Sequence, residues 1–559
     1  MVGDFITFRL GLNLDFAGLA LPCPVPFPKF VSCAASSGDV TLGFVHPSRD
    51  ALKVTSGMPA TLLAATSGIM YFLAFPGVGL WPLSFAAFVP LLVAFEGRSS
   101  RECAWLAAFA GFAANLAGFC WLSETIHTFG GQSWLVAFAL VALLAAYQAG
   151  RMGLFGWLYG RARVHQWPQW PVACCAFVAS ELAYPLLLPW NFSACVHGLP
   201  ALCQSAEIGG PIAVGLTLLL PNLAIAEGLL GTVRGRRISW RYMATGLAVP
   251  LVSAALGMVR IRQFETLVSA APAVRVGLVQ GNRDAAVSPT DRTRALDTQI
   301  RLSMDLQAHG VDFIVWSEGA IAGILESSLP GALAAIHARG IRSPLLAGAT
   351  LFEGRTGAWL EHNSAVASDA DGRVMGHYDK HRLLPFGESI PLGTMFPSLY
   401  ERFSQGVRMV PGRSFDPIVL AGHRVAALIC YEDALPSFVN EVANRARPEM
   451  LVNLTNDSWF GSPEPWIHLA LAQSRAIEHR RYLMRATQGG VTAVIDPMGR
   501  ATVVAEAFRA TAIEGRAHWM ASGPTGYELW GDLPWWAISA CAIATALRRR
   551  RMTSRASER

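Results

Sequence analysis

Three segments of the sequence each place a side chain able to do chemistry next to an apolar run. Glu318 follows Ile-Val-Trp-Ser, Lys380 lies in Tyr-Asp-Lys-His-Arg-Leu-Leu-Pro-Phe-Gly-Glu, and Cys430 follows Leu-Ile. A cysteine becomes a nucleophile when a base or a positive field removes its proton, and the oxyanion formed by its attack needs a fixed donor. A carboxylate and an ammonium group meet those two needs. The three residue types together therefore predict acyl chemistry through a cysteine thioester.

Each of these residues also has an ordinary structural interpretation. A lone cysteine in an apolar run is most often part of a packed core, and a glutamate or lysine after a strand is usually solvated. Their coincidence argues otherwise. Glu318 follows residues that are expected to be buried, where a carboxylate is costly unless it has a partner. Cys430 is followed by Tyr431 and Glu432 rather than by more apolar residues.

Alternating strands and helices are expected to position these side chains. Buried strands are predicted at 274–280, 312–316, 344–350, 424–431, 450–455 and 491–495, with a helix from Thr290 to His309. A repeated strand and helix pattern is typical of an α/β layered domain, which displays catalytic groups at the ends of buried strands.

The composition adds a membrane part to this enzyme-like region. The chain has 559 residues, of which 52% are hydrophobic and 15% charged, and its mean hydropathy is +0.36. A net charge of +6 without a basic patch interleaved with aromatic residues gives no indication of nucleic-acid binding. The 10 cysteines form no CxxC pair, which argues against a zinc site or a disulfide framework. Whether Cys195 and Cys203 pair stays open.

Eight apolar segments are long enough to cross a bilayer. They lie near residues 58–76, 78–96, 103–122, 134–158, 168–188, 208–230, 242–259 and 528–547.

Arginines predict the sidedness of these segments. They follow the second, fourth and sixth predicted spans and the eighth, whereas the stretches 123–133 and 189–207 have no Lys or Arg. Under the positive-inside rule the arginine-rich ends are cytoplasmic, and the domain between spans seven and eight lies outside the cytoplasm. The arginines are Arg98 and Arg101, then Arg151, Arg161 and Arg163, then Arg234, Arg236, Arg237 and Arg241, and finally Arg548 to Arg551.

The predicted organisation is an extension at 1–57, a membrane domain at 58–262, a catalytic domain at 273–517, a span at 526–547 and a basic cytoplasmic tail at 548–559. The extension contains a proline cluster and charged residues, so we expect the functional chain to begin at Met58.

The combination of motifs resembles bacterial apolipoprotein N-acyltransferases, membrane-embedded members of the nitrilase superfamily. The resemblance covers the chain from about residue 58 and includes the Glu318, Lys380 and Cys430 segments in family order. Further similar motifs are Val279-Gln280-Gly281-Asn282, Asn456 to Gly461, the His468 to Glu478 helix with Arg475, Arg485-Ala486-Thr487 followed by Gly490 to Val494, Trp121 with Thr128 to Gly131, and Pro189-Trp190. Gln488 departs from the family, which commonly has an asparagine there.

The resemblance implies a fold of about eight membrane spans joined to a nitrilase-like α-β-β-α sandwich. It implies that Glu318 is the general base, Cys430 the nucleophile and Lys380 the oxyanion donor, with Glu388, Glu432 and Tyr431 as accessory residues near the site. No cofactor and no metal are implied.

The activity implied is the last step of lipoprotein maturation. An acyl chain passes from a phospholipid, typically phosphatidylethanolamine, through a Cys430 thioester to the α-amine of a diacylglyceryl-cysteine at the N-terminus of an apolipoprotein. The implied enzyme is a monomer in the bacterial inner membrane, with its catalytic domain on the periplasmic side.

Two other functions remain open at this point. A membrane-tethered amidase or nitrile hydrolase would use the same three residues but would leave the spans before the domain unexplained. A transporter or scaffold would explain the spans, but the apolar half has few charges of the kind that line ion pathways, since Glu124, His127 and Glu181 are expected near span ends.

Overall fold

The computed structural model describes residues 58–164, 169–233, 240–282, 289–355, 358–390, 409–521 and 523–547, with the single positions 393, 395, 396 and 398. The described residues all belong to one compact unit. The predicted extension at 1–57, the basic tail at 548–559 and the arginines at 234, 236 and 237 lie outside the described residues.

Apolar helices occupy each position where a membrane span is predicted. The second segment is broken into a 3-10 helix and a short α-helix rather than forming one continuous helix. The elements of the helical part are α1 (Met58–Ala74), η3 (Trp81–Phe85), α2 (Val89–Ala94), α3 (Ser100–Gly118), α4 (Leu122–Thr128), α5 (Trp134–Val164), α6 (Gln169–Ala183), η4 (Phe192–Val196), α7 (Pro200–Cys203), α8 (Ala206–Val233) and α9 (Trp240–Ala270).

Three of these helices are long and apolar enough to cross a membrane, at Trp134–Ala162, Ala206–Thr232 and Trp240–Ala270. A fourth span results if α3 and α4, which bend by 55° at their junction, count as one. Shorter apolar helices occur at Pro59–Ala74, Trp81–Ala94 and Leu533–Leu547. The chain is thus a membrane protein with several candidate spans, and the number of eight stays a prediction.

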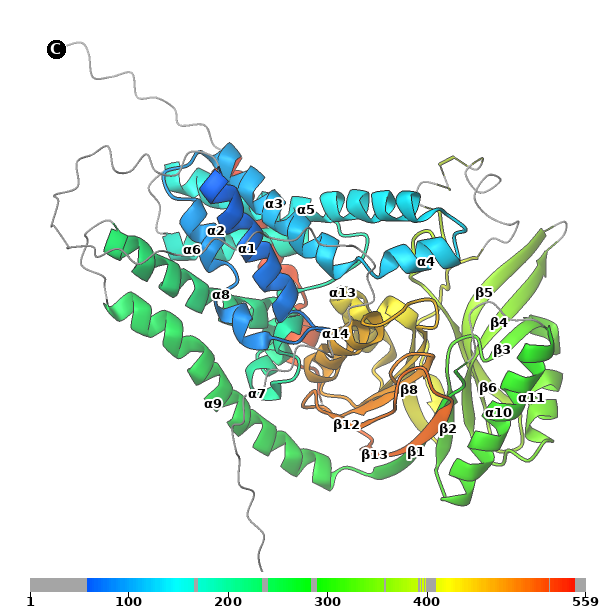
Figure 1. The fold of residues 1–559 in the computed structure, drawn as a ribbon. Helices are drawn as coiled ribbons and strands as arrows, with labels where there is room; N and C mark the ends of the chain where they lie inside the picture. The colour runs from blue at the N-terminus through cyan, green and yellow to red at the C-terminus, as the bar shows by residue number, and fades with distance from the viewer. Residues whose placement is uncertain are drawn as a thin grey trace, which may run out of the picture. The chain divides into compact units, whose positions relative to one another are not determined.

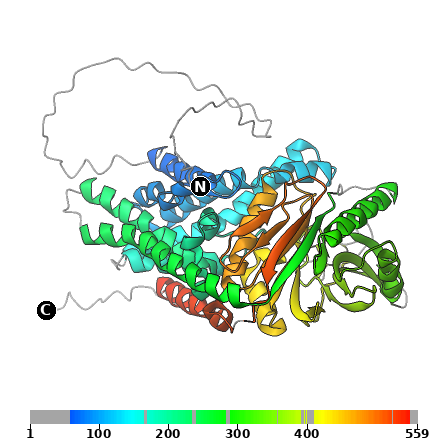
Figure 2. The ribbon, with the colours of Figure 1, turned by 90° about the horizontal axis from the view of Figure 1, so that it is seen from below.

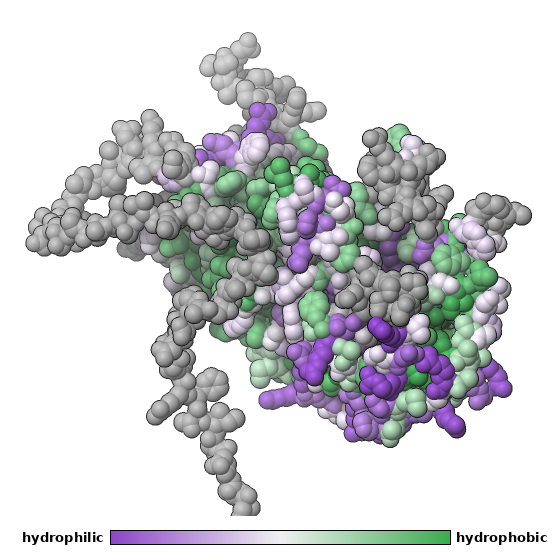
Figure 3. Space-filling model, turned by 45° about the vertical axis from the view of Figure 1, so that its right-hand side comes forward, coloured by the Kyte–Doolittle hydropathy of each residue, from purple (hydrophilic) through white to green (hydrophobic). Residues whose placement is uncertain are grey.

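Large apolar side chains project from this helical part. Leu135 is 81% exposed and Trp105 is 78% exposed, and α9 presents Leu251 and Leu256 in the same way. Figure 3 shows hydrophobic residues over much of the helical part, whereas hydrophilic residues gather lower on that face, over the α/β part. An apolar surface of this kind suits lipid rather than water.

Arg151 corrects one assumption of the sequence analysis. It lies inside α5 rather than in a loop and is 2% exposed. Its guanidinium forms an ion pair of 3.3 Å with Glu181 of α6, donates to the Trp190 carbonyl at 2.7 Å and stacks 4.3 Å from the Trp190 ring. Arg151 therefore says nothing about sidedness, and Glu181 is its largely buried ion-pair partner.

The α/β part begins directly after α9. Its strands are β1 (Ala273–Gln280), β2 (Phe313–Trp316), β3 (Ile321–Leu325), β4 (Leu345–Arg355), β5 (Ala358–Ser368), β6 (Val374–Asp379), β7 (Ile418–Leu420), β8 (His423–Ile429), β9 (Met450–Asn456), β10 (Leu483–Gln488), β11 (Ala493–Ile495), β12 (Ala501–Val504) and β13 (Thr511–His518). Its helical elements are α10 (Pro289–Ala308), η5 (Glu326–Ser328), α11 (Leu329–His337), η6 (Cys430–Ala434), α13 (Pro436–Ala446), α14 (Glu464–His479) and α15 (Gly526–Trp530).

The strands form two sheets. One has seven strands in the order β13-β1-β2-β4-β5-β6 with β3 paired to β4, and the other has six in the order β12-β11-β10-β9-β8-β7. At the centres of the sheets β1, β2 and β4 are parallel to one another, as are β8, β9 and β10.

Three apolar layers show why the sheets stack. One core, with Leu278 of β1 and Val452 of β9, lies between the sheets. A second packs α10 and α11 on the outer face of the first sheet, and a third packs α13 and α14 on the outer face of the other. The result is the expected α-β-β-α sandwich (Figure 1).

The last helix, α16 (Leu533–Leu547), returns the chain to the helical part. It packs against α6 (Figure 2). The α5 side chain of Arg161 donates to the Ala546 carbonyl at 3.0 Å, which satisfies one of the carbonyls left free at a helix end. Cys195 and Cys203 are both free and buried.

Candidate active site

The ends of three strands bring the three predicted reactive residues together. Glu318 follows β2, Lys380 follows β6 of the same sheet, and Cys430 follows β8 of the opposite sheet. All three are buried, with 8%, 1% and 6% of their surface exposed. The face-to-face packing of the sheets is what lets residues so far apart in sequence meet.

Lys380 is held between two carboxylates. Its Nζ lies 2.8 Å from Oε1 of Glu388 and 3.3 Å from Oε1 of Glu318. Burial alone would lower the pKa of Lys380, but Glu318 and Glu388 outweigh it and hold that pKa well above its usual value. The ammonium group is therefore a fixed positive charge and a ready donor.

Glu318 is a carboxylate whose surroundings favour accepting a proton. Burial raises its pKa, an effect that Lys380 partly opposes and the charge of Glu388 reinforces. Two carboxylates flank one ammonium group, and Glu388 makes the shorter contact with it. The Lys380 ammonium therefore neutralises the negative charge of Glu318 less fully than that of Glu388. Glu318 thus has the properties of a general base.

The Cys430 thiol is protonated at rest. Burial raises the pKa of Cys430 well above its usual value, and Glu318 adds to this, while Lys380 opposes it. A neutral thiol needs a neighbouring base to become a nucleophile. The backbone of Cys430 has φ 54°, in the left-handed region that costs a non-glycine residue free energy.

Glu432 joins the cysteine turn to the lysine loop. Its Oε2 accepts from the Ile429 amide at 2.8 Å and the Tyr378 hydroxyl at 2.9 Å. Its Oε1 accepts from the amides of His381 and Arg382 at 2.8 and 2.9 Å. Burial raises the pKa of Glu432 to about 7 despite these donors. The carboxylate thus fixes Cys430 and Lys380 relative to each other.

The other two predicted accessory residues also lie at the site. Glu388 accepts from the Leu384 amide at 2.8 Å through Oε2, so that it closes the loop after Lys380 while its Oε1 holds the ammonium. Tyr431 donates to the Leu383 carbonyl at 3.0 Å, and Lys380 Nζ lies 5.8 Å from the centre of its ring.

Asn363 is a site residue that the sequence analysis missed. From β5, its Nδ2 donates to Oε1 of Glu318 at 2.6 Å and to Oε1 of Glu388 at 2.8 Å. Nothing in its local sequence distinguishes it, and β5 is not among the strands that the sequence predicts. Only the pairing of β5 with β4 and β6 brings it between the carboxylates.

A glycine allows the close approach of β4 to the Glu318 segment. A side chain at Gly348 would place its Cβ 2.5 Å from the Cα of Glu318 and 2.5 Å from the Ser317 carbonyl oxygen. Ser317 in turn donates to Gln488 Oε1 at 2.9 Å, so the residue that departs from the family pattern supports the segment before Glu318.

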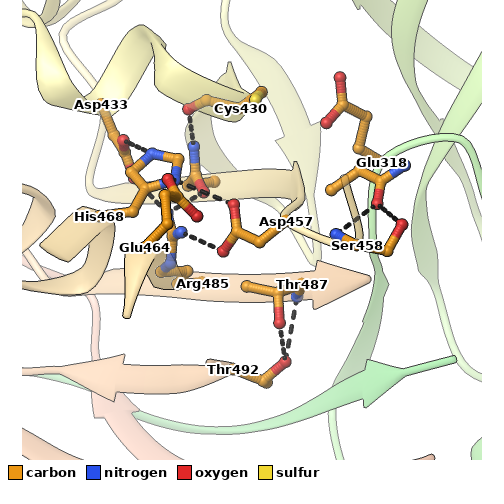
Figure 4. A network of polar contacts seen from close by, with 12 residues as sticks. Glu318, Cys430, Asp433, Asp457, Ser458, Glu464, His468, Arg485, Thr487 and Thr492 are labelled. Carbon is orange, nitrogen blue, oxygen red and sulfur yellow. Dashed lines mark hydrogen bonds and ion pairs between the residues drawn. The ribbon is translucent and has the colours of Figure 1, made fainter. Parts of the chain in front are cut away.

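Behind the cysteine turn lies a buried group of five ionisable side chains, which we call the charged cluster (Figure 4). Burial and Arg485 would lower the pKa of His468, but the aspartates on either side raise it to about 10, so His468 is an imidazolium. Burial raises the pKa of Glu464 to about 8. The members of the charged cluster are Asp433, Asp457, Glu464, His468 and Arg485.

Asp457, Glu464 and His468 offer ligand atoms within 4.8 Å of one another. The carboxylate of Asp457 is already paired with His468 at 3.0 Å and with Arg485 at 3.0 Å, and a guanidinium beside the site would repel a cation. We therefore interpret the cluster as an ion-pair network.

Comparisons with known proteins relate the chain to two protein families. The family model for the apolipoprotein N-acyltransferase N-terminal domain matches residues 67–224, and that for carbon-nitrogen hydrolase matches residues 275–515. An apolipoprotein N-acyltransferase of Azotobacter vinelandii is 31% identical over 518 residues, covering 89% of this chain and 96% of that protein. One of Methylococcus capsulatus is 31% identical over 535 residues, covering 89% and 98%. A solved amidase of the nitrilase superfamily from Nesterenkonia shares 20% identity over 45% of this chain and 93% of that chain, with a TM-score of 0.33.

Proposed function

Because this chain belongs to the apolipoprotein N-acyltransferase family, we propose that Cys430 carries an acyl group from a membrane phospholipid to the amino terminus of a lipoprotein. The enzyme is an acyltransferase of lipoprotein maturation, where it performs the final acylation. The observation that carries the proposed roles is the buried contact of Lys380 with Glu318 beside the Cys430 thiol.

In the first half-reaction, Glu318 takes the thiol proton as the Cys430 sulfur attacks the ester carbonyl of the phospholipid. The carbonyl oxygen becomes an oxyanion, which the Lys380 ammonium stabilises. The tetrahedral intermediate then expels the lysophospholipid alkoxide, and Glu318 returns the proton to it. A thioester remains on Cys430.

In the second half-reaction, the α-amine of a diacylglyceryl-cysteine attacks the thioester carbonyl. Glu318 accepts the proton that the amine loses, the sulfur leaves, and the proton passes to it. The product is an N-acylated lipoprotein, and the thiol is restored. Glu388 and Glu432 hold Lys380 and the cysteine turn in place in both steps, and Tyr431 contributes one wall beside the lysine.

The finer assignments complete the proposal. The donor is phosphatidylethanolamine, used at its first acyl position, and the enzyme acts as a monomer in the bacterial inner membrane. Residues 58–262 form the membrane domain, 273–517 the catalytic domain on the periplasmic side, 526–547 the final span and 548–559 a cytoplasmic tail. The arginines in the ends of the apolar segments support this sidedness.

The first half-reaction can be tested without an acceptor. Purified protein incubated with phosphatidylethanolamine should gain one acyl mass on the peptide that contains Cys430, because a thioester sheltered from water hydrolyses slowly. Cys430→Ser should abolish this adduct. Cys541→Ser, which removes an exposed thiol in α16, serves as the matched control and should form the adduct as the wild type does. An adduct that survives in Cys430→Ser would refute the proposal.

A further inference from the structure

Four of the five members of the charged cluster form a closed ring. Asp433 belongs to η6, the turn that begins with Cys430, and Asp457 follows β9. His468 reaches the two aspartates from α14, and Arg485 reaches them from β10. Figure 4 shows the four side chains converging beside the cysteine turn.

Each aspartate in the ring uses both carboxylate oxygens. Asp433 accepts from His468 Nε2 at 2.8 Å and from Arg485 Nη1 at 2.7 Å. Asp457 accepts from His468 Nδ1 at 3.0 Å and from Arg485 Nη2 at 3.0 Å. His468 can donate to both aspartates only when both of its ring nitrogens carry protons. Two positive and two negative groups therefore balance inside the ring.

One side of the ring holds the backbone of the cysteine. Arg485 Nη1 also donates to Asn453 Oδ1 at 2.9 Å, and Asn453 Nδ2 donates to the Cys430 carbonyl at 2.9 Å. Cys430 has the left-handed backbone conformation that a non-glycine residue keeps only when its surroundings enforce it. The ring contacts the turn at Asp433 and, through Asn453, at Cys430 itself.

The other side of the ring holds a loop that touches the helical part. Two residues after Asp457, the Trp459 carbonyl accepts from Thr125 Oγ1 of α4 at 3.0 Å. The Trp459 and Phe129 rings lie 4.9 Å apart, and the Phe460 and Trp121 rings 5.3 Å apart. His468 therefore bridges the cysteine turn and the loop that meets α4.

We propose that His468 is a positioning residue for acyl transfer, which fixes the Cys430 turn against the loop at Asp457 so that the sulfur faces Glu318 and Lys380. This inference rests on the proposed function. Burying the four charged groups of the ring is no efficient way to stabilise a fold, because a well-packed apolar cluster does as well or better. What the ring provides instead is a defined geometry on the segment that carries the nucleophile.

His468→Gln tests the role, because glutamine retains a donor but loses the positive charge and cannot bridge the two aspartates in the same way. The maximal rate of adduct formation on Cys430 should fall about 10- to 100-fold, the size expected when a reacting group is displaced by about 1 Å. The phospholipid concentration at half-maximal rate should stay unchanged, since His468 acts through Asp433 and Asp457 rather than on the substrate.

A second substitution separates positioning from a general loss of stability. In His468→Gln, Asp433 and Asp457 share Arg485 as their one cation, so the ring carries a surplus negative charge. Adding Asp433→Asn removes that surplus charge. Asp433→Asn alone should also slow acylation, but the double variant should be faster than the product of the two single effects predicts. Asp433→Asn keeps an oxygen that accepts from Arg485, so it carries the test by itself if His468→Gln does not fold.

Glu478→Gln is the matched control. It breaks another buried ion pair on α14, between Glu478 and Arg475, which faces Tyr527 of α15 rather than the cysteine turn. It should lower the Tm while leaving the acylation rate within about twofold of the wild type. Equal acylation rates in His468→Gln, Asp433→Asn and Glu478→Gln would overturn the inference. A wild type that forms no adduct would instead refute the proposed function.

Discussion

Glu318 and Lys380 form one buried pair, and their surroundings prepare them for opposite tasks. Lys380 has two carboxylate partners and keeps its proton, whereas Glu318 shares that lysine with Glu388 and has a raised pKa. The same burial raises the pKa of the Cys430 thiol. Proton transfer from Cys430 to Glu318 during the attack, rather than a standing thiolate, is the route that these pKa values favour.

Replacing Glu318 should therefore slow the first half-reaction strongly. Glu318→Gln keeps an oxygen that can accept from Asn363 and Lys380 but cannot take the thiol proton. We expect acyl-adduct formation on Cys430 in a single turnover to slow by about 10²-fold or more, the usual contribution of a positioned base. Glu326→Gln, at an exposed position in η5, is the control and should react at the wild-type rate. Equal rates in the two variants would rule out Glu318 as the base.

Glu464 should make the stability of the protein depend on pH. Its pKa is about 8 in the folded protein because of burial, against about 4.3 in an unfolded chain. Between these values the folded state binds one more proton, so the free energy of unfolding falls as the pH rises. Glu464→Gln removes this titration. The wild type should lose stability relative to the variant by up to ~1.4 kcal/mol per pH unit between about pH 5 and pH 8.

Thermal unfolding of both proteins across that pH range measures the effect. A difference in stability that stays constant with pH would show that Glu464 is not protonated in the folded protein.

At the scale of elements, the sequence predicts the site better than it predicts the sheets. Strands with long apolar runs, such as β1 and β9, are recognised locally, and the reactive residues follow strand ends. Among the strands that were not predicted, β13 pairs with β1, which is distant in the sequence, so no local pattern shows it. The strands β5 and β6 pair with their neighbours in the sequence, but polar residues interrupt their apolar runs. Asn363 was missed because it lies in β5, where its sequence neighbours give no sign of a site.

Arg151 shows a second limit of local patterns. An arginine near the end of an apolar segment usually marks a membrane boundary. Here the neighbouring helix α6 supplies Glu181, and the ring and carbonyl of Trp190 complete the environment of the guanidinium. Such a partner is visible only after the helices have packed.

The Arg151 and Glu181 pair should be a coupled stability element between α5 and α6. Arg151→Met leaves a buried carboxylate without its cation and should destabilise the protein by about 3–5 kcal/mol. Adding Glu181→Met removes that carboxylate and should restore much of the loss. Unfolding in detergent measures both effects, and a double variant that is less stable than Arg151→Met would contradict the pairing.

At the scale of the whole molecule, apolar helices that precede and follow the sandwich in the sequence bring the site to two substrates that are both held in a membrane. The sandwich is joined to the helical part by side-chain contacts as well as by the chain. Arg480 donates to Glu207 at 2.6 Å and to Gln204 at 2.8 Å, and Arg260 of α9 pairs with the same Glu207 at 2.5 Å. These contacts fix the catalytic part on the helices that would face lipid.

The proposed sidedness makes a prediction about reporter fusions. A reporter enzyme that is active only outside the cytoplasm should work when fused near Gly422, in the turn between β7 and β8, and should fail when fused near Arg236. Fusion protein levels measured by immunoblot are the control. The reverse pattern of activity would invert the topology and change the pool of substrates that the site can reach.

The fate of the acyl group on Cys430 tests the central claim most directly. Protein that has been loaded with a labelled acyl chain from phosphatidylethanolamine is mixed with a diacylglyceryl-cysteine peptide or with buffer alone, and the labelled products are followed by mass spectrometry. Transfer predicts that the peptide discharges the adduct rapidly into N-acylated peptide, while the adduct in buffer persists. Release of free fatty acid at the same rate with and without the peptide would show a hydrolase and contradict the account.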